Sequence, residues 1–255
     1  MLKSLKENSL AGLEVGSRDY FAAQKRLILG RPLLKRCYDE WYRHLLEDAW
    51  SVPGHGVLLE LGSGGSYLKD LEPSVVTSDV VAGVAEQVVD GRSLPFPDYS
   101  IRALFLTHVL HHIPDVDAFL REAERALVPG GVISMIEVAH TPFARFFFRN
   151  FHPEPYRDDV REWSFAQQDA MMDSNQALSW ILFVRDRGHF ERQHPELSIE
   201  QITLLPWFSY LLAGGVTGRS LVPHCFNPVV FGLERLLRPL APLFALHWHI
   251  RVRKA

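Results

Sequence analysis

The sequence predicts an α/β protein built around a doubly wound, mostly parallel sheet. Three features lead to this prediction: short apolar runs bounded by glycines, amphipathic helices between them, and a glycine-rich turn directly after the first run. Strands that alternate with helices favour such a sheet, because the crossover helices cover both of its faces. The length of 255 residues is consistent with one large α/β domain.

Composition and charge exclude several other classes. Hydrophobic residues make up 47% of the chain and charged residues 22%, so a disordered chain is excluded. The net charge of −3 comes without a long block of either sign, and we expect no nucleic-acid partner. Cys37 and Cys225 form neither a CxxC motif nor a disulfide framework. With no apolar segment typical of a signal peptide at the N-terminus, we expect a cytoplasmic location.

Two helices are expected before the first strand. Apolar spacing predicts one over residues 19–29 and another over 32–50, separated by the helix-breaking sequence Gly30-Arg31-Pro32. Tyr20 and Phe21 on the first helix could close over a bound ligand as a lid. The same pattern is typical of an amphipathic packing helix, so both interpretations stay open.

The strands of the sheet come next. Val57 to Leu61 is an apolar run bounded by glycines, which is typical of a buried parallel strand. Further strands are expected over residues 74–78, 87–90, 101–107 and 132–138, with helices over 66–71 and 115–127. The connection 80–86 is too short for a full crossover helix, so one helix of the usual set is missing or reduced to a turn.

The last third of the chain has weaker patterns. Residues 139–195 lack clear alternation and are rich in aromatic and charged side chains. Beyond or within this stretch we expect a helix over 178–190, a strand over 197–204, a helix over 228–237 and a final strand over 243–252. The basic and apolar residues from Phe231 to Arg253 could dock on a membrane surface. A closing antiparallel strand is the better interpretation of that segment.

The segment that carries chemistry follows the first strand. In Glu60-Leu61-Gly62-Ser63-Gly64-Gly65-Ser66, the glycines let a ligand approach the backbone closely, and the following amides face it. Asp79 lies 19 residues beyond Glu60, at the end of the next strand. That position suits a carboxylate that accepts hydrogen bonds from ribose hydroxyls. A nicotinamide dehydrogenase would share both features, so they do not decide the ligand alone.

Five pieces of sequence occur in a recognisable order: Val57 to Gly65, Asp79, Asp90 ahead of Leu94-Pro95-Phe96, His108 to Ile113, and Leu127 to Gly131. Together they resemble the class I S-adenosylmethionine-dependent methyltransferases, particularly the methyltransferase type 11 group. The third glycine of the usual GxGxG motif is Ser66 here, a mild departure because Gly65 can supply the close packing. The resemblance covers residues 57–138. It implies a Rossmann-like, seven-stranded sheet with an antiparallel last strand, and S-adenosyl-L-methionine as cofactor.

The resemblance also suggests which residues hold the cofactor. The glycine turn would hold the amino acid end, with carboxylates near the ammonium, the ribose and the adenine. The expected cofactor-binding residues are Glu60, Gly62, Ser63, Gly64, Asp79, Val80, Asp90, Gly91, Thr107 and His108. We expect no metal ligands.

Methyl transfer to oxygen benefits from a general base, and histidine suits that role near neutral pH. The candidate bases are His108, His111 and His140, although each could instead only contact the cofactor or pack. The candidates for binding the acceptor are Tyr20, Glu137, Arg145, His152 and Tyr156. The aromatic and basic cluster around Arg145 and Tyr156 could stack on a sugar or grip an anion. It could equally be a small satellite core.

We therefore expect a single domain over residues 1–255. It would comprise a helical lid (1–52), a cofactor-binding core (53–138), a substrate-side insertion (139–197) and closing strands with a helix (198–255). The expected activity is methyl transfer to a small-molecule or saccharide acceptor, on oxygen. Two alternatives stay open: an enzyme that cyclises S-adenosylmethionine and releases methylthioadenosine, and a non-catalytic binding subunit.

Overall fold

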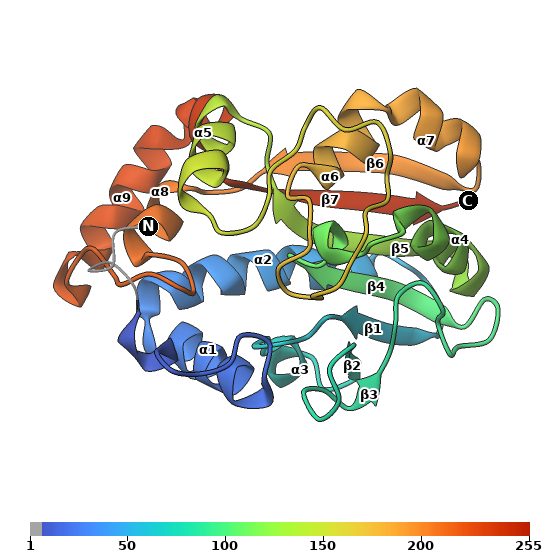
Figure 1. The fold of residues 1–255 in the computed structure, drawn as a ribbon, viewed down its shortest axis with the longest axis horizontal. Coiled ribbons are helices and arrows are strands. Elements are labelled where there is room, and N and C mark those ends of the chain that lie inside the picture. Colours follow the sequence, from blue (N-terminus) through green and yellow to red (C-terminus); the bar gives the residue numbers. More distant parts are fainter. Residues whose placement is uncertain (1–6) are drawn as a thin grey trace.

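The computed structural model describes residues 7–255, and a seven-stranded sheet forms its centre (Figure 1). The strand order is β3-β2-β1-β4-β5-β7-β6, and β7 runs antiparallel to both of its neighbours. The strands are β1 Val57–Leu61, β2 Val75–Asp79, β3 Gln87–Val88, β4 Ile101–Thr107, β5 Leu127–Val138, β6 Leu197–Leu204 and β7 His247–Lys254. The predicted fold class, a mostly parallel seven-stranded sheet with an antiparallel last strand, is confirmed.

Helices cover both faces of this sheet. The longer ones are α1 Arg18–Gly30, α2 Pro32–Trp50, α4 Val116–Ala126, α5 Pro142–Phe151, α7 Arg187–Gln193 and α9 Asn227–Leu237. The shorter ones are α3 Leu68–Leu71, α6 Leu178–Trp180, α8 Phe208–Ala213 and α10 Ala241–Phe244. Within the described residues, none is long and apolar enough to cross a membrane.

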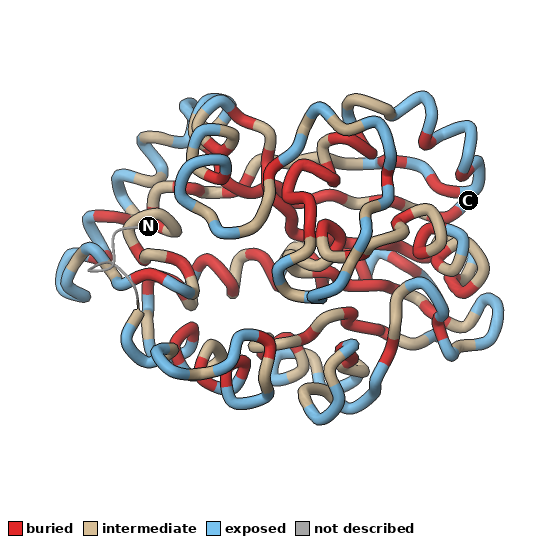
Figure 2. The backbone as a smooth tube through the Cα atoms, viewed as in Figure 1, coloured by how far each residue is buried: buried red, intermediate tan, exposed pale blue. Residues whose placement is uncertain are grey.

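Side-chain alternation along the central strands divides the interior into two cores. Leu58 and Phe105 point to the face covered by α1 and α2, whereas Leu59 and Leu104 point to the face covered by α4, α6 and α7. Both faces of β4 are buried, as a parallel strand covered on two sides requires. Figure 2 shows the buried backbone concentrated in these central strands.

The predicted elements needed five main corrections. The closing strand begins at His247, not at residue 243, because Pro242 starts α10 at residues 241–244. The helix expected over 178–190 is divided into α6, a π-helical turn over Ile181–Arg185, and α7. The third strand has only two residues, and the fifth begins at Leu127. The helix α5 was missed, although Thr141 caps it and Pro142 occupies its first turn.

The short connection between β2 and β3 contains no helix, as the sequence predicted. The preceding crossover is also short, since α3 has a single turn. One side of the glycine turn therefore lacks a long crossover helix. The N-terminal helix α1 packs there instead: a Cβ atom on Gly65 would lie 2.9 Å from Cβ of Gln24.

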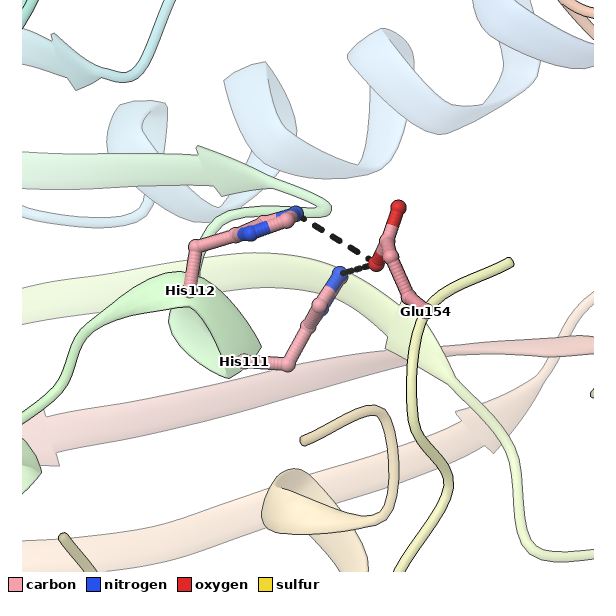
Figure 3. A group of neighbouring side chains, drawn as sticks. All are labelled: His111, His112 and Glu154. Carbon is pink, nitrogen blue, oxygen red and sulfur yellow. Dashed lines mark ion pairs between the residues drawn. The ribbon is translucent and has the colours of Figure 1, made fainter. Parts of the chain in front are cut away.

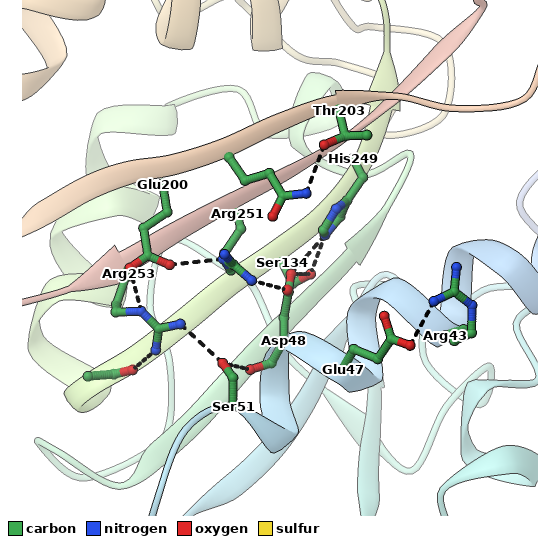
Figure 4. A network of polar contacts seen from close by, with 12 residues as sticks. Arg43, Glu47, Asp48, Ser51, Ser134, Glu200, Thr203, His249, Arg251 and Arg253 are labelled. Carbon is green, nitrogen blue, oxygen red and sulfur yellow. Dashed lines mark hydrogen bonds and ion pairs between the residues drawn. The ribbon is translucent and has the colours of Figure 1, made fainter. Parts of the chain in front are cut away.

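The buried carboxylate of Asp48 connects α2 to strands β5 and β7 (Figure 4). Asp48 is 3% exposed and accepts hydrogen bonds from Ser134 Oγ at 2.6 Å, His249 Nε2 at 2.8 Å and Arg251 Nη1 at 2.8 Å. Ser134 lies on β5, and the other two partners lie on β7. One side chain thereby fixes the position of α2 across two antiparallel strands.

We expect Asp48→Ala to lower the free energy of unfolding by about 3 kcal/mol, because it leaves the partners of a buried carboxylate unpaired. Burial alone would raise the pKa of Asp48, but the hydrogen bonds from His249 and Ser134 outweigh it and lower that pKa. The contribution of Asp48 is therefore present at neutral pH and is lost as the pH falls through its depressed pKa.

Urea unfolding at neutral and acid pH measures this difference. The parent and Asp48→Ala chains should converge in stability in acid. A matched control is Glu47→Ala, which removes an exposed carboxylate from the same helix and should change stability by less than about 0.5 kcal/mol. Equal losses in the two variants at neutral pH would contradict the role given to Asp48.

Candidate functional site

The glycine turn lies at the carboxyl end of β1, where its backbone adopts conformations that favour glycine. Gly62 has φ +61° and Gly64 has φ +44°. A Cβ atom on Gly62 would lie 2.6 Å from Cγ2 of Val109, in the turn after β4. The left-handed backbone and this close approach together explain why the turn needs glycine.

Glu60, just before the turn, is a buried carboxylate that lacks a counterpart. It is 1% exposed, and neither of its carboxylate oxygens has a hydrogen-bond partner among the described residues. Burial raises its pKa to about 7. A cavity beside it is also lined by Ser63, Gly64, Phe21 and Lys25. A ligand ammonium would supply the missing charge and hydrogen bonds, so this position fits the amino acid end of S-adenosylmethionine.

Asp79, at the end of β2, is buried but well supplied with hydrogen bonds. Its carboxylate accepts from the backbone amides of Gly64 at 3.1 Å and Val81 at 2.9 Å. Burial raises its pKa against these hydrogen bonds. The side chain thus anchors the glycine turn from the position where the sequence predicted a ribose contact, beside the exposed Val80.

At the predicted adenine position, the carboxylate of Asp90 already has a partner within the chain. Asp90 is only partly buried, and Arg92 forms an ion pair with its carboxylate at 2.6 Å. The neighbouring Gly91 packs closely, since a Cβ atom there would lie 3.3 Å from the ring of Phe119. For Asp90 to accept from an adenine amino group, it would have to share its carboxylate with Arg92.

The N-terminal helix closes over the glycine turn. Tyr20 is 7% exposed and Phe21 8% exposed. The Phe21 ring lies 3.0 Å from where a Cβ atom of Gly64 would be. This geometry is compatible with both a lid and a packing helix. The aromatic residues of α1 pack in the interior, and they cover the glycine turn that is predicted to bind the cofactor.

His108 follows β4 in an unusual backbone conformation. Its φ of +58° is uncommon for a residue with a side chain. Its ring lies 5.5 Å from Trp41 and 4.8 Å from His247, measured between centroids. Its Nε2 atom is buried without a partner among the described residues, as is Oγ1 of Thr107. Burial lowers the pKa of His108 to about 4, which leaves the ring neutral near pH 7.

His111 lies between two carboxylates. Its Nδ1 lies 2.6 Å from Oε2 of Glu137, and its Nε2 lies 3.4 Å from Oε2 of Glu154. Burial opposes the charged ring, but the two carboxylates prevail and raise the pKa of His111 to about 10. The ring therefore holds its proton at neutral pH. This argues against His111 as a general base and makes it a fixed positive charge.

Three side chains meet at this point, as Figure 3 shows. The ligand atoms of His111, His112 and Glu154 all lie within 4.8 Å of one another, which is close enough to hold a metal ion. Oε2 of Glu154 also lies 2.7 Å from the amide nitrogen of Gln176. The charged His111 contacts both Glu137 and Glu154, and we interpret the group as an ion-paired cluster.

The remaining predicted residues lie on the insertion. His140 stacks on Trp180 with centroids 3.8 Å apart, and its Nδ1 lies 2.8 Å from the hydroxyl of Tyr156. Arg145 pairs with Asp158 at 3.1 Å, and Arg149 contacts the same carboxylate, so two positive charges share one negative charge there. His152 is linked to the Glu154 cluster through Gln176, which lies 2.9 Å from its Nδ1, while His140 belongs to a separate aromatic stack.

Sequence reasoning missed three residues that the fold brings together with His108 and His111. Trp41 comes from α2, Glu154 from the insertion and His247 from the start of β7. His247 resembles His108, since its Nδ1 is buried without a partner among the described residues and burial holds its pKa well below the usual range. No local motif marks these positions, because each contact joins distant parts of the chain.

Comparison with known proteins finds a related domain in this chain. Residues 59–135 match the model of the family described as "Methyltransferase domain". The matched segment contains the glycine turn, Asp79 and the His108 turn, within the sheet order described above. Over this segment the chain is similar to the class I S-adenosylmethionine-dependent methyltransferases. The cofactor of this family is the one that the unpaired carboxylate of Glu60 fits.

Curated relatives match between 24% and 48% of this chain. A ubiquinone/menaquinone biosynthesis C-methyltransferase of Shewanella frigidimarina is 29% identical over 120 residues, covering 38% of this chain and 48% of the relative. A protein of the same name from Xanthomonas axonopodis pv. citri is 30% identical over 159 residues, covering 48% and 63%. The match thus spans about half the length of the first of these relatives.

Solved structures are similar over most of the chain at low identity. Geranyl diphosphate C-methyltransferase from Streptomyces coelicolor is 16% identical, with a TM-score of 0.49, covering 98% of this chain and 85% of that chain. The [4+2]-cyclase SpnF is 14% identical, with a TM-score of 0.46, covering 87% and 80%.

The unpaired Glu60 predicts how cofactor affinity depends on pH. Because the pKa of Glu60 is about 7 without a ligand, a bound ammonium must convert it to the charged form. Affinity for S-adenosylhomocysteine should therefore fall as the pH drops below about 7, by up to tenfold per pH unit. Isothermal titration between pH 5 and 8 measures this.

The Glu60→Gln variant should bind more weakly by roughly 1.5–3 kcal/mol at pH 8 and lose most of this pH dependence. The control Glu86→Gln removes an exposed carboxylate near Lys69 and should keep the parent's profile. A Glu60→Gln chain that binds with the parent's affinity and pH profile would show that the ammonium lies elsewhere.

Proposed function

We propose that this protein transfers the methyl group of S-adenosylmethionine to a small-molecule acceptor, on an oxygen atom. The observation that carries the proposal is the buried, unpaired carboxylate of Glu60, which stands beside the glycine turn of a methyltransferase fold. The cofactor supplies a methyl group on a positively charged sulfur. Glu60, the turn amides and Asp79 are the groups of this chain that would hold it.

His108 is the proposed general base. With its proton on Nδ1, the ring would keep a free lone pair on the buried Nε2, and its low pKa leaves the ring neutral near pH 7. The carboxylate of Glu137 raises the pKa of His108 against burial, and so would stabilise the ring once it takes a proton. His111 cannot take that role while it holds its own proton between Glu137 and Glu154.

The acceptor would lie beside two groups of unlike side chains. One group consists of the neutral rings of His108, His247 and Trp41, whose centroids lie 4.8 to 5.5 Å apart. The other group is the charged pair of His111 and Glu154. This arrangement suits a hydroxyl carried on a planar or apolar body better than a fully polar sugar, although a saccharide with one apolar face would also fit.

The names of the curated relatives favour a second candidate, in which the methyl group goes to carbon. Removal of a phenolic proton by the same His108 would activate a neighbouring ring carbon. Both candidates use one base and one cofactor site, and they differ only in the atom that is methylated.

The test uses S-adenosylmethionine carrying a deuterated methyl group, with catechols, hydroxyquinols and sugars as acceptors. We expect the label in one acceptor class, equimolar S-adenosylhomocysteine, and an oxygen-linked methyl group by NMR. A carbon-linked label would establish the second candidate. Methylthioadenosine released without acceptor would overturn methyl transfer, and bound cofactor without any turnover would identify a binding subunit.

The His108→Asn variant should lower kcat by about 100-fold while cofactor affinity stays near the parent's, because it removes only the proton acceptor. Because the pKa of His108 is about 4, this ring stays unprotonated between pH 5 and 8. If His108 is the base, its protonation should not lower the parent's kcat at saturating cofactor in that range. The control His55→Asn changes an exposed histidine before β1 and should not affect kcat. A parent kcat that climbs steadily toward pH 10 would assign the base to His111 instead.

A further inference from the structure

A stripe of exposed apolar side chains runs along the C-terminal helices. Large hydrophobic residues follow at intervals of three and four over α9, the 3-10 turn after it and α10, so they fall on one side of the helical path. All are at least 40% exposed, and Leu236 reaches 74%. The stripe consists of Phe226, Val229, Leu233, Leu236, Leu240 and Leu243.

The opposite side of α9 is the one that packs on the protein. Val230 is buried, and Phe231 packs beneath the guanidinium of Arg36 from α2 at 3.9 Å. Glu234 accepts hydrogen bonds from the backbone amides of Trp207, Phe208 and Ser209 at the start of α8. The inner face of α9 therefore packs on α2 and α8. The apolar stripe on the outer face has no partner among the described residues.

The exposed charges beside the stripe are positive. From residue 221 to the end of α10, the basic side chains Arg235 and Arg238 are exposed. The single carboxylate of this segment, Glu234, is turned inward to α8, and Glu40 on the neighbouring α2 is only partly exposed. A helical face with apolar side chains and only positive exposed charges is complementary to an anionic lipid surface.

The stripe ends beside the insertion. Phe244 at the end of α10 lies 5.8 Å from Phe143 on α5, measured between ring centroids. Figure 1 shows α9 and the following helical segments along one edge of the molecule, ending next to α5. Two exposed side chains of α5, Phe146 at 55% and Phe151 at 47%, add to the apolar surface there. It therefore reaches the helix that precedes His152 and Glu154.

We propose that the α9–α10 face and the adjoining end of α5 dock on the surface of an anionic membrane. The helices would lie in the plane of the interface, with the stripe among the acyl chains and Arg235 and Arg238 at the headgroups. An amphiphilic acceptor could then enter the site from the lipid surface; this consequence rests on the proposed function, whereas the docking does not.

A second copy of the chain is the competing occupant, since apolar residues at alternating spacings of three and four also suit helix pairing. The charges favour lipid. In a symmetric pair of these helices, Arg235 and Arg238 would approach the same residues of the other copy, with no exposed carboxylate in the segment to balance them. A lipid surface containing anionic headgroups balances both.

The test is co-sedimentation of the full chain with vesicles of phosphatidylcholine alone or mixed with phosphatidylglycerol. We expect binding to the mixed vesicles that weakens as salt rises. The double variant Leu233→Asp/Leu236→Asp should reduce that binding at least tenfold. Arg235→Gln/Arg238→Gln should weaken binding to mixed vesicles several-fold and leave the weaker binding to phosphatidylcholine alone unchanged.

A matched control is Leu71→Asp/Val88→Asp, which places two carboxylates at exposed apolar positions on α3 and β3. It should bind vesicles nearly as well as the parent. Circular dichroism and S-adenosylhomocysteine titration check that every variant keeps its fold and cofactor site. Absence of vesicle binding by the parent, or equal loss in the control and the leucine variant, would overturn the proposal. A parent dimer in light scattering that the leucine variant abolishes would assign the stripe to a second copy.

Discussion

The buried carboxylate of Glu137 fixes the turn after β4 and the ring of His111. It has no exposed surface and occupies the penultimate position of β5. It accepts hydrogen bonds from the amides of Val109 at 3.0 Å and Leu110 at 2.8 Å, the residues that follow His108. These bonds hold the turn in which His108 keeps its positive φ, a conformation that persists only where surrounding contacts enforce it. Through His111 the same carboxylate positions Glu154 on the insertion.

Three buried carboxylates around the site differ in how they are satisfied, and the difference separates scaffold from binding site. Glu137 has two amides and an imidazole, and Asp79 has two amides. Glu60 has no partner among the described residues. An unpaired buried carboxylate is costly, so its presence beside a glycine turn points to a ligand group that binds there. Asp79 has a double role, since it holds Gly64 while facing the predicted ribose position.

Much of the fold was predictable because its signals are local. Apolar runs, glycines and helical apolar spacing predict seven strands, the two N-terminal helices and the missing crossover helix. For the candidate site, the sequence indicates only residues at or next to strand ends, as for Glu60, Asp79 and His108. The contacts of Trp41, Glu154 and His247 depend on distant elements meeting, which no spacing reveals. The protonation of His111 also depends on Glu154, a loop residue more than forty positions away in the chain.

In the C-terminal segment, the sequence predicts a closing strand correctly but places its start too early. Basic and apolar residues follow from Phe231 onward, and their pattern predicts a strand over residues 243–252. In the structure Leu243 belongs to α10, and the strand begins at His247. Because the helical path continues to residue 244, Leu240 and Leu243 extend the apolar face of α9 as far as α5. The same correction places His247 at the start of β7, beside His108, so one boundary affects both the proposed docking surface and the acceptor site.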